Sequence, residues 1–214
     1  MRFPAKDGSP LAGVLVGRGT TAVIAAHQVT SNVCEWLPFA RRLASHHGLL
    51  VLAYDTRGDG VSPSGPDVSR VDLDMPGAVA YLRGRGVTRI VLAGASAGGT
   101  DALVAAAAVS PPVDGVVALS PATVIGPQAD AVVAAPQVTA PALIMAAAQD
   151  GSSPEDARTI HAATASRDKT LAIVPGSSHG THLLDDPTYG RVYADQVEAW
   201  ILRRLPARAV GQSP

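Results

Sequence analysis

The stretch that decides the fold is VLAGASAGGT, residues 91–100. An apolar run stops at Gly94, and a single Ser96 follows among residues with very small side chains. The apolar run predicts a buried strand, and the small residues predict a tight turn from that strand into a helix. Two explanations fit a serine in such a turn: close packing of the backbone, or a reaction in which the hydroxyl must reach a substrate atom.

Strand and helix patterns alternate on both sides of this turn. Strands are predicted at residues 11–17, 21–27, 49–55, 89–95, 115–120, 142–148 and 170–176. From residue 49 onward the runs are apolar on both faces, which is typical of a parallel sheet covered by helices. The sequence therefore predicts an α/β fold with a mostly parallel central sheet and helices on both of its faces. We expect one domain over residues 1–206 and a frayed tail over residues 207–214.

The segments between these strands have helical patterns. Helices are predicted within residues 37–48, 72–86, 98–110, 153–165 and 189–205. Pro76 and Gly77 should confine the second helix to the part that follows them, because proline removes a helical hydrogen bond. Ser153 is the predicted N-cap of the fourth helix, with Pro154 at its first position. His46 and His47 fall in the last turn of the first helix, where they complement the negative end of the helix dipole.

The composition excludes several classes of protein. A formal net charge of −1 without blocks of like charge argues against a nucleic-acid partner or a membrane surface. The single cysteine, Cys34, rules out a disulfide framework and a thiolate metal site. No apolar run approaches the roughly 20 residues that cross a bilayer, and the first residues lack the apolar core of a signal peptide. We therefore expect a cytoplasmic protein.

Gly94, Ser96 and Gly98 form the G-x-S-x-G pattern of a nucleophile elbow. In such an elbow the serine backbone is strained so that its hydroxyl projects above the sheet, and small residues on either side avoid a collision. The helix that follows offers free N–H groups to developing negative charge. The position of the pattern between a predicted strand and a predicted helix makes it more specific than the five letters alone.

A dinucleotide-binding turn is the alternative interpretation of a glycine-rich junction between a strand and a helix. That motif needs a glycine at the position of Ser96 and an acidic residue about 20 positions later, at the end of the next strand. The next predicted strand ends in ALSPAT, residues 118–123, which contains no acidic residue. The dinucleotide interpretation is therefore rejected.

A nucleophilic serine needs a base within hydrogen-bond reach, and the base needs a carboxylate that orients it. Among the six histidines, His179 and His182 lie in a loop after the last predicted strand, and His179 is favoured because it follows that strand closely. Asp150 comes two residues after the end of the strand predicted at 142–148. Ser96, Asp150 and His179 thus follow the carboxyl ends of three separate strands, where ligands bind in open α/β sheets.

The chain resembles the α/β-hydrolase family over nearly its whole length. Four stretches carry the resemblance: GASAGG at 94–99, AQDGSSPEDA at 148–157, PGSSHGTHLL at 175–184 and AYDTRGDGVSPSG at 53–65. The first three resemble the family's elbow, acid loop and histidine loop. The fourth resembles a D-x-R-G turn that is usually architectural, so we interpret Asp55 and Arg57 as structural residues.

The resemblance also implies an oxyanion hole made of two backbone N–H groups. One would belong to Ala97, the residue after the serine, and the other to the loop after an early strand. Members of the family commonly have His-Gly in that loop, whereas this chain has His27 and Gln28. Gln28 is the expected second donor, through its backbone N–H with a contribution from its side-chain amide, and His27 is expected to shape the loop.

The connection between the strands predicted at 115–120 and 142–148 is where many members of the family insert a lid. Only residues 121–141 are available here, so we expect no cap domain and an open site for substrates of modest size. Trp36, Leu37, Val124 and Tyr189 are candidates for lining that site, and each is equally plausible as an ordinary core residue. Cys34 lacks an elbow and is interpreted as an incidental thiol.

These inferences lead to a serine hydrolase that cleaves small-molecule carboxylic esters or thioesters without a metal ion or an organic cofactor. Two alternatives stay open: an acyltransferase with the same three residues, and a non-catalytic member of the fold that binds a ligand or a partner protein. The sequence does not predict the oligomeric state, the acyl-chain preference or the pathway.

Overall fold

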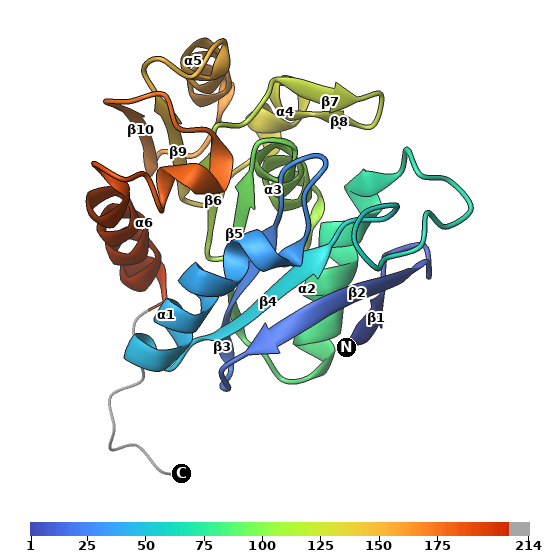
Figure 1. The fold of residues 1–214 in the computed structure, drawn as a ribbon. Coiled ribbons are helices and arrows are strands. Elements are labelled where there is room, and N and C mark those ends of the chain that lie inside the picture. The colour runs from blue at the N-terminus through green and yellow to red at the C-terminus, as the bar shows by residue number, and fades with distance from the viewer. Residues whose placement is uncertain (206–214) are drawn as a thin grey trace.

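A computed structural model describes residues 1–205 of the chain (Figure 1). Its centre is an eight-stranded sheet with the order β1-β2-β4-β3-β5-β6-β9-β10. β1 and β2 are antiparallel to their neighbours, and β4, β3, β5, β6, β9 and β10 are parallel to one another. This arrangement confirms the predicted mostly parallel sheet. The tail expected at residues 207–214 lies outside the described residues.

All seven predicted strands are present, with ends that differ by at most two residues from the prediction. They are β2 (Pro10–Val16), β3 (Thr21–Ala26), β4 (Leu50–Asp55), β5 (Arg89–Ala95), β6 (Gly115–Leu119), β9 (Ala142–Ala147) and β10 (Lys169–Val174). Three further strands were not predicted: β1 (Arg2–Pro4) and a small hairpin of β7 (Val124–Gly126) and β8 (Ala129–Asp130). β3 and β5 lie at the middle of the sheet, so the stretch quoted first belongs to its most buried part.

Helices cover both faces of the sheet (Figure 1). The helices are α1 (Leu37–His47), α2 (Asp74–Gly84), α3 (Ala97–Ala108), α4 (Ala131–Ala134), α5 (Ser153–Ala163) and α6 (Gly190–Arg204), together with short 3₁₀ turns at 33–36, 71–73, 135–137 and 180–183. One core cluster joins the sheet to α2, α3 and α5, and a second joins it to α1 and α6. The parallel strands are therefore buried on both faces, as their continuous apolar runs require.

The second helix begins earlier than predicted. Pro76 lies in the first turn of α2, which starts at Asp74. A proline is tolerated there because the first N–H groups of a helix have no intrahelical partner. Gly77 follows in the same helix, and a Cβ on it would collide with the backbone of Ala5. The prediction that the helix is confined to the part after Pro76 was therefore wrong.

The start of α5 also differs from the prediction. Ser152 is the N-cap residue, although its side chain makes no capping hydrogen bond, and Pro154 is the second helical residue. Ser153 lies inside the helix with its hydroxyl 3.4 Å from Nδ1 of His179. A residue predicted to cap a helix thus contacts a residue of the predicted site.

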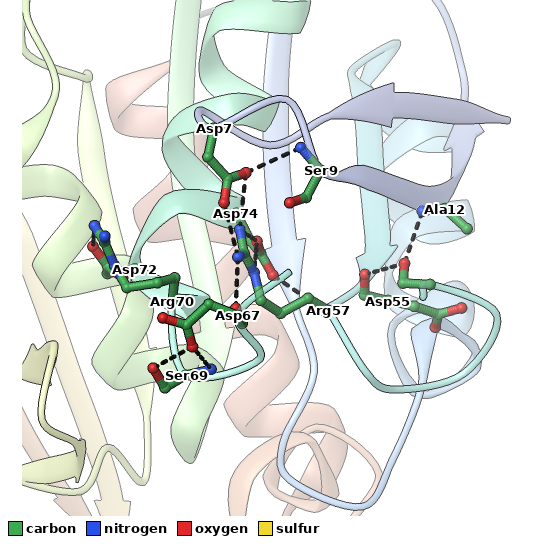
Figure 2. Close-up of polar contacts among 11 residues, drawn as sticks. Asp7, Ser9, Ala12, Asp55, Arg57, Asp67, Ser69, Arg70, Asp72 and Asp74 are labelled. Carbon is green, nitrogen blue, oxygen red and sulfur yellow. Dashed lines mark hydrogen bonds and ion pairs between the residues drawn. The ribbon is translucent and has the colours of Figure 1, made fainter. Parts of the chain in front are cut away.

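The turn after β4 is held by ion pairs of Arg57 with two aspartates and by hydrogen bonds of Asp55, as its architectural interpretation requires. The Arg57 side chain is fully buried and donates from Nε to Asp74 at 2.7 Å and from a terminal nitrogen to Asp7 at 3.0 Å (Figure 2). The Arg57 hydrogen bond is the main reason why the pKa of Asp7 falls to about 2. Asp55 accepts the backbone N–H groups of Val33 at 2.7 Å and of Val61 at 2.9 Å. Asp55 therefore ties the loop after β3 to the loop after β4.

The connection between β6 and β9 is short. It contains the β7–β8 hairpin and the four residues of α4, which pack beside α3 (Figure 1). Thr100 of α3 donates to the carbonyl of Ala122 at 2.6 Å, so the connection is anchored on α3 from its start. The connection in which no cap domain was expected thus forms a hairpin and one short helix. Within residues 1–205, no helix has the length and apolar character needed to span a membrane.

A buried carboxyl group in α3 has no obvious structural partner. Asp101 is 3% exposed, and its Oδ1 makes no hydrogen bond within the described residues. Burial is the main cause that raises its pKa to about 8, and the nearby Asp74 and Asp72 add to the effect. The folded protein therefore keeps a proton on Asp101 over a pH range in which the unfolded chain has lost it.

We predict that Asp101→Asn stabilises the protein increasingly as the pH rises from about 4 to about 8. In that window the unfolded chain binds fewer protons than the folded chain, so the wild type loses up to about 1.4 kcal/mol of stability per pH unit at this group. The amide keeps the shape of the side chain and does not titrate. Chemical denaturation of both proteins at several pH values measures the difference, with the exposed Asp185→Asn as control. A difference that does not change with pH would contradict the assignment.

Candidate active site

Ser96 lies at the junction of β5 and α3 in a strained backbone conformation. Its φ is 51° and its ψ is −116°. A non-glycine residue in such a region costs about 1–3 kcal/mol and persists only where the surroundings impose it. The backbone N–H of Ser96 donates to the carbonyl of Leu119 at 2.8 Å, which fixes the turn to the end of β6. Among residues 1–205 the Ser96 hydroxyl makes no hydrogen bond, and the residue is half-buried.

Two glycines make room for this conformation. A Cβ on Gly94 would collide with the carbonyl of Gly98, and a Cβ on Gly98 would collide with the carbonyl of Ala26 and lie 2.6 Å from that of His27. The first turn of α3 therefore packs directly against the carboxyl end of β3. The N–H groups of Ala97 and Gly98 are at the amino end of this helix, where the helix dipole favours negative charge.

His179 and Asp150 are in direct contact. Nδ1 of His179 lies 2.8 Å from Oδ2 and 3.0 Å from Oδ1 of Asp150. The two residues follow β10 and β9, whose parallel register pairs Val174 with Ala147 and brings the two loops together. With the proton on Nδ1 donated to the carboxylate, Nε2 carries the free lone pair and can accept a proton. The Asp150 side chain is 12% exposed, whereas that of His179 is 40% exposed.

The histidine loop is fixed by contacts with three other segments. The N–H of Gly180 donates to Oγ of Ser120 at 3.1 Å, and Ser120 is a buried residue with a φ of 46° at the end of β6. A Cβ on Gly180 would lie 3.3 Å from the Cβ of Ala95 and would collide with Oε1 of Gln28. The residue after His179 therefore packs against the residue before Ser96. Within the described part of the chain, Ser96 and His179 share this edge of the sheet without a direct hydrogen bond between them.

The backbone N–H of Gln28 is already occupied. It donates to Oε1 of Glu35 at 2.9 Å, and the other oxygen of Glu35 accepts a short hydrogen bond from the Ser31 hydroxyl. In this arrangement the N–H cannot serve as an oxyanion donor, which corrects the expectation for the backbone of Gln28. The Gln28 side chain reaches Gly180, and its buried Oε1 has no hydrogen-bond partner among residues 1–205.

The His27 side chain makes hydrogen bonds in the loop that it was expected to shape. It is 2% exposed, and its Nδ1 lies 2.7 Å from the carbonyl oxygen of Gln28. Its Nε2 accepts the backbone N–H of Thr56 at 3.1 Å. The imidazole therefore joins the loop after β3 to the loop after β4, and both of its nitrogens are used.

The four candidates for lining residues lie in different surroundings. Trp36 is 1% exposed and donates from Nε1 to the carbonyl of Ala26 at 2.9 Å, so it is a core residue and not a lining residue. Leu37 is half-buried at the start of α1. Val124 is 51% exposed in the hairpin, and Tyr189 is 37% exposed and stacks on Tyr193. Only the last two offer a substantial exposed surface.

Three residues near the site were missed or assigned another role. Glu35 and Ser120 were not singled out, because a glutamate in a loop and a serine after a strand are common in any sequence. Ser153 was assigned to a helix cap. Their contacts depend on backbone geometry that joins segments far apart in the chain, which a local pattern does not indicate. Cys34 is exposed, and its backbone N–H donates to Oδ1 of Asn32. His182 is exposed and lies 3.5 Å from Asp185.

A family model described as serine aminopeptidase, S33, matches residues 18–136, which is more than half of the 214-residue chain. The chain belongs to this α/β-hydrolase family. The match includes the loop with Gln28, the turn with Asp55 and the elbow with Ser96, whereas Asp150 and His179 lie beyond it. No curated protein matches this hydrolase in sequence.

Solved structures with the same fold include three enzymes of similar size. An esterase from Thermogutta terrifontis has a TM-score of 0.76 at 15% identity, covering 95% of this chain and 98% of its own. A monoacylglycerol lipase from Paleococcus ferrophilus has a TM-score of 0.77 at 18% identity, covering 91% and 99%. An enol-lactonase from Burkholderia xenovorans LB400 has a TM-score of 0.73 at 18% identity, covering 95% and 99%. At these identities the similarity shows the α/β-hydrolase fold of the chain.

We predict that Gly98→Ala severely destabilises this hydrolase, because the new Cβ would meet two backbone carbonyls that cannot move independently of β3. Gly84→Ala is the matched control, since nothing lies within 4 Å of a Cβ at that helical position. The control should leave stability unchanged or raise it by up to about 1 kcal/mol. Thermal denaturation of both variants measures the effect. Equal stability of the two variants would show that the elbow has more room than its carbonyls indicate.

Proposed function

We propose that this hydrolase cleaves carboxylic esters or thioesters through an acyl-enzyme intermediate, with Ser96 as nucleophile, His179 as base and Asp150 as the orienting acid. The observation that carries the proposal is the contact of Asp150 with Nδ1 of His179, which leaves Nε2 as a base at the edge of the sheet where the strained Ser96 is presented. The family and the fold support a hydrolase, and the ester bond is our inference from these residues.

In the proposed reaction, His179 takes the proton of the Ser96 hydroxyl as the serine oxygen attacks the acyl carbon. Asp150 holds the imidazole in the required tautomer and stabilises the imidazolium that forms. The protonated His179 then donates to the leaving alcohol or thiol, and the acyl group stays on Ser96. Water activated by the same imidazole releases the acid. Every proton in this cycle passes through Nε2 of His179.

Two N–H groups are proposed to stabilise the oxyanion. Ala97 supplies one from the first turn of α3, where the helix dipole adds to the stabilisation. We assign the second to the side-chain amide of Gln28, because Glu35 holds the backbone N–H of the same residue. The oxygen of that amide, Oε1, lies beside Gly180, and Gly180 lies beside Ala95, so the amide group is next to the elbow.

The proposed substrates are small molecules of modest size. The connection over residues 121–141 follows the carboxyl end of β6 and forms a hairpin and one short helix, and the exposed Val124 belongs to that hairpin. The exposed Tyr189 follows the histidine loop. These two side chains are the proposed lining residues, and the neighbouring esterase, lipase and lactonase folds support substrates with an acyl group.

An acyltransferase is the alternative that uses the same three residues, with an alcohol or amine in place of water. A non-catalytic binding role is the other alternative. Product partition between water and added alcohols separates the first alternative from hydrolysis. Failure of ester hydrolysis together with failure of covalent labelling would favour the second.

We predict that Ser96→Ala abolishes labelling by a fluorophosphonate probe and abolishes hydrolysis of p-nitrophenyl esters. The exposed Ser45→Ala is the control and should retain both. A panel of acyl chain lengths, together with aminoacyl anilides, identifies the bond that is cleaved and tests the aminopeptidase description of the family. Labelling that persists in Ser96→Ala would overturn the assignment of the nucleophile.

We predict that Gln28→Ala lowers kcat by roughly 10²–10³, which is the usual effect of removing one oxyanion donor. Gln28→Glu keeps the size of the side chain, loses its N–H donors and should be equally impaired. KM should change little in both variants, and steady-state kinetics on a p-nitrophenyl ester measures the two constants. Retention of most of kcat in Gln28→Ala would move the second donor to a backbone N–H of the same loop.

A further inference from the structure

A cluster of potential metal ligands lies between α1 and α6. His46 and His47 end α1, and Glu198 projects from α6. Nε2 of His47 lies 2.7 Å from Oε1 of Glu198, and one ligand atom from each of the three residues lies within 4.8 Å of the other two. Figure 1 shows the two helices on the same face of the sheet.

This cluster is at the end of the sheet opposite the proposed catalytic residues. α1 ends at His47, and β4 begins three residues later at Leu50. The cluster therefore lies near the amino end of β4, whereas Ser96, Asp150 and His179 follow carboxyl ends of parallel strands. Nothing in the proposed hydrolytic reaction uses these three side chains.

Two carboxylates and the carbonyl end of a helix lie around the cluster. Arg42 binds the other oxygen of Glu198 and also binds Asp195, and Arg191 acts on Asp195 as well, so the two carboxylates face two guanidinium groups. The carbonyl end of α1 adds partial negative charge beside His46 and His47.

Arg42 also orients the carboxylate. It holds Oε2 of Glu198, which leaves Oε1 directed at the His47 imidazole. Carboxylates that ligate metals in proteins are usually fixed by such a second hydrogen bond. His46 is exposed and its ring lies 6.1 Å from that of His47, so its side chain can rotate toward the same point without disturbing the core.

We propose that His46, His47 and Glu198 bind a divalent transition-metal ion of the zinc type, which would clamp α1 to α6. Two imidazoles and one carboxylate suit Zn²⁺, Ni²⁺ or Cu²⁺, whereas Ca²⁺ and Mg²⁺ prefer oxygen ligands alone. Water completes the coordination, because the protein supplies three ligands. The bound ion acts on stability and not on the hydrolytic step.

The test is isothermal titration calorimetry of the whole protein with ZnCl₂, together with thermal denaturation in the presence and absence of the metal. The His179→Ala background is used throughout, so that the proposed catalytic imidazole contributes no binding. We expect one site per chain, a rise in Tm that is reversed by EDTA, and a loss of at least about tenfold in affinity in His46→Ala. His46 is exposed, so this variant should fold normally.

Two comparisons keep the result specific. Glu198→Gln should weaken binding as well, and His182→Ala, which removes another exposed histidine near a carboxylate, should bind zinc as the parent does. Absence of binding in the parent, or equal loss in His46→Ala and His182→Ala, would overturn the proposal. Neither outcome bears on the hydrolytic activity, which is measured separately.

Discussion

The close approach of α3 to the end of β3 is the constraint on which the site depends. Gly98 can lie against the carbonyls of Ala26 and His27 only because it has no side chain. That contact fixes the short distance between the start of α3 and the sheet. This short distance forces Ser96 into a positive φ. It also places the amino end of α3 beside the loop that carries Gln28. Packing and the proposed chemistry, which the sequence first offered as alternatives, therefore make demands on the same atoms.

Much of the fold could be predicted because long apolar runs are a strong signal for central strands. β5 is predicted to the residue, since a run buried on both faces ends at Ala95, directly before Ser96. β1, β7 and β8 have at most three residues each and no alternation long enough to distinguish them from loops. The early start of α2 was missed because Pro76 was treated as an interior residue, whereas its position in the first turn costs no hydrogen bond.

The candidate site also has features that could be predicted from the sequence and features that could not. Asp150 and His179 could be paired from the sequence, because parallel strands bring their carboxyl ends to one edge. The occupation of the Gln28 N–H by Glu35 could not be foreseen, since it depends on how residues 28–36 return toward the end of β3. The burial of Trp36 could not be predicted either. The local sequence around an aromatic residue after a loop does not show whether its side chain packs in the core or lines the site.

The double role of Asp55 has a consequence for substrate binding. One carboxylate accepts backbone N–H groups from Val33 and from Val61, so neither loop can shift without breaking a hydrogen bond of the other. Both loops are therefore ordered before a ligand arrives. A ligand that contacts residues 28–36 then loses little affinity to the entropy of fixing that segment. A buried acid outside the proposed chemistry would in this way make the binding surface preorganised.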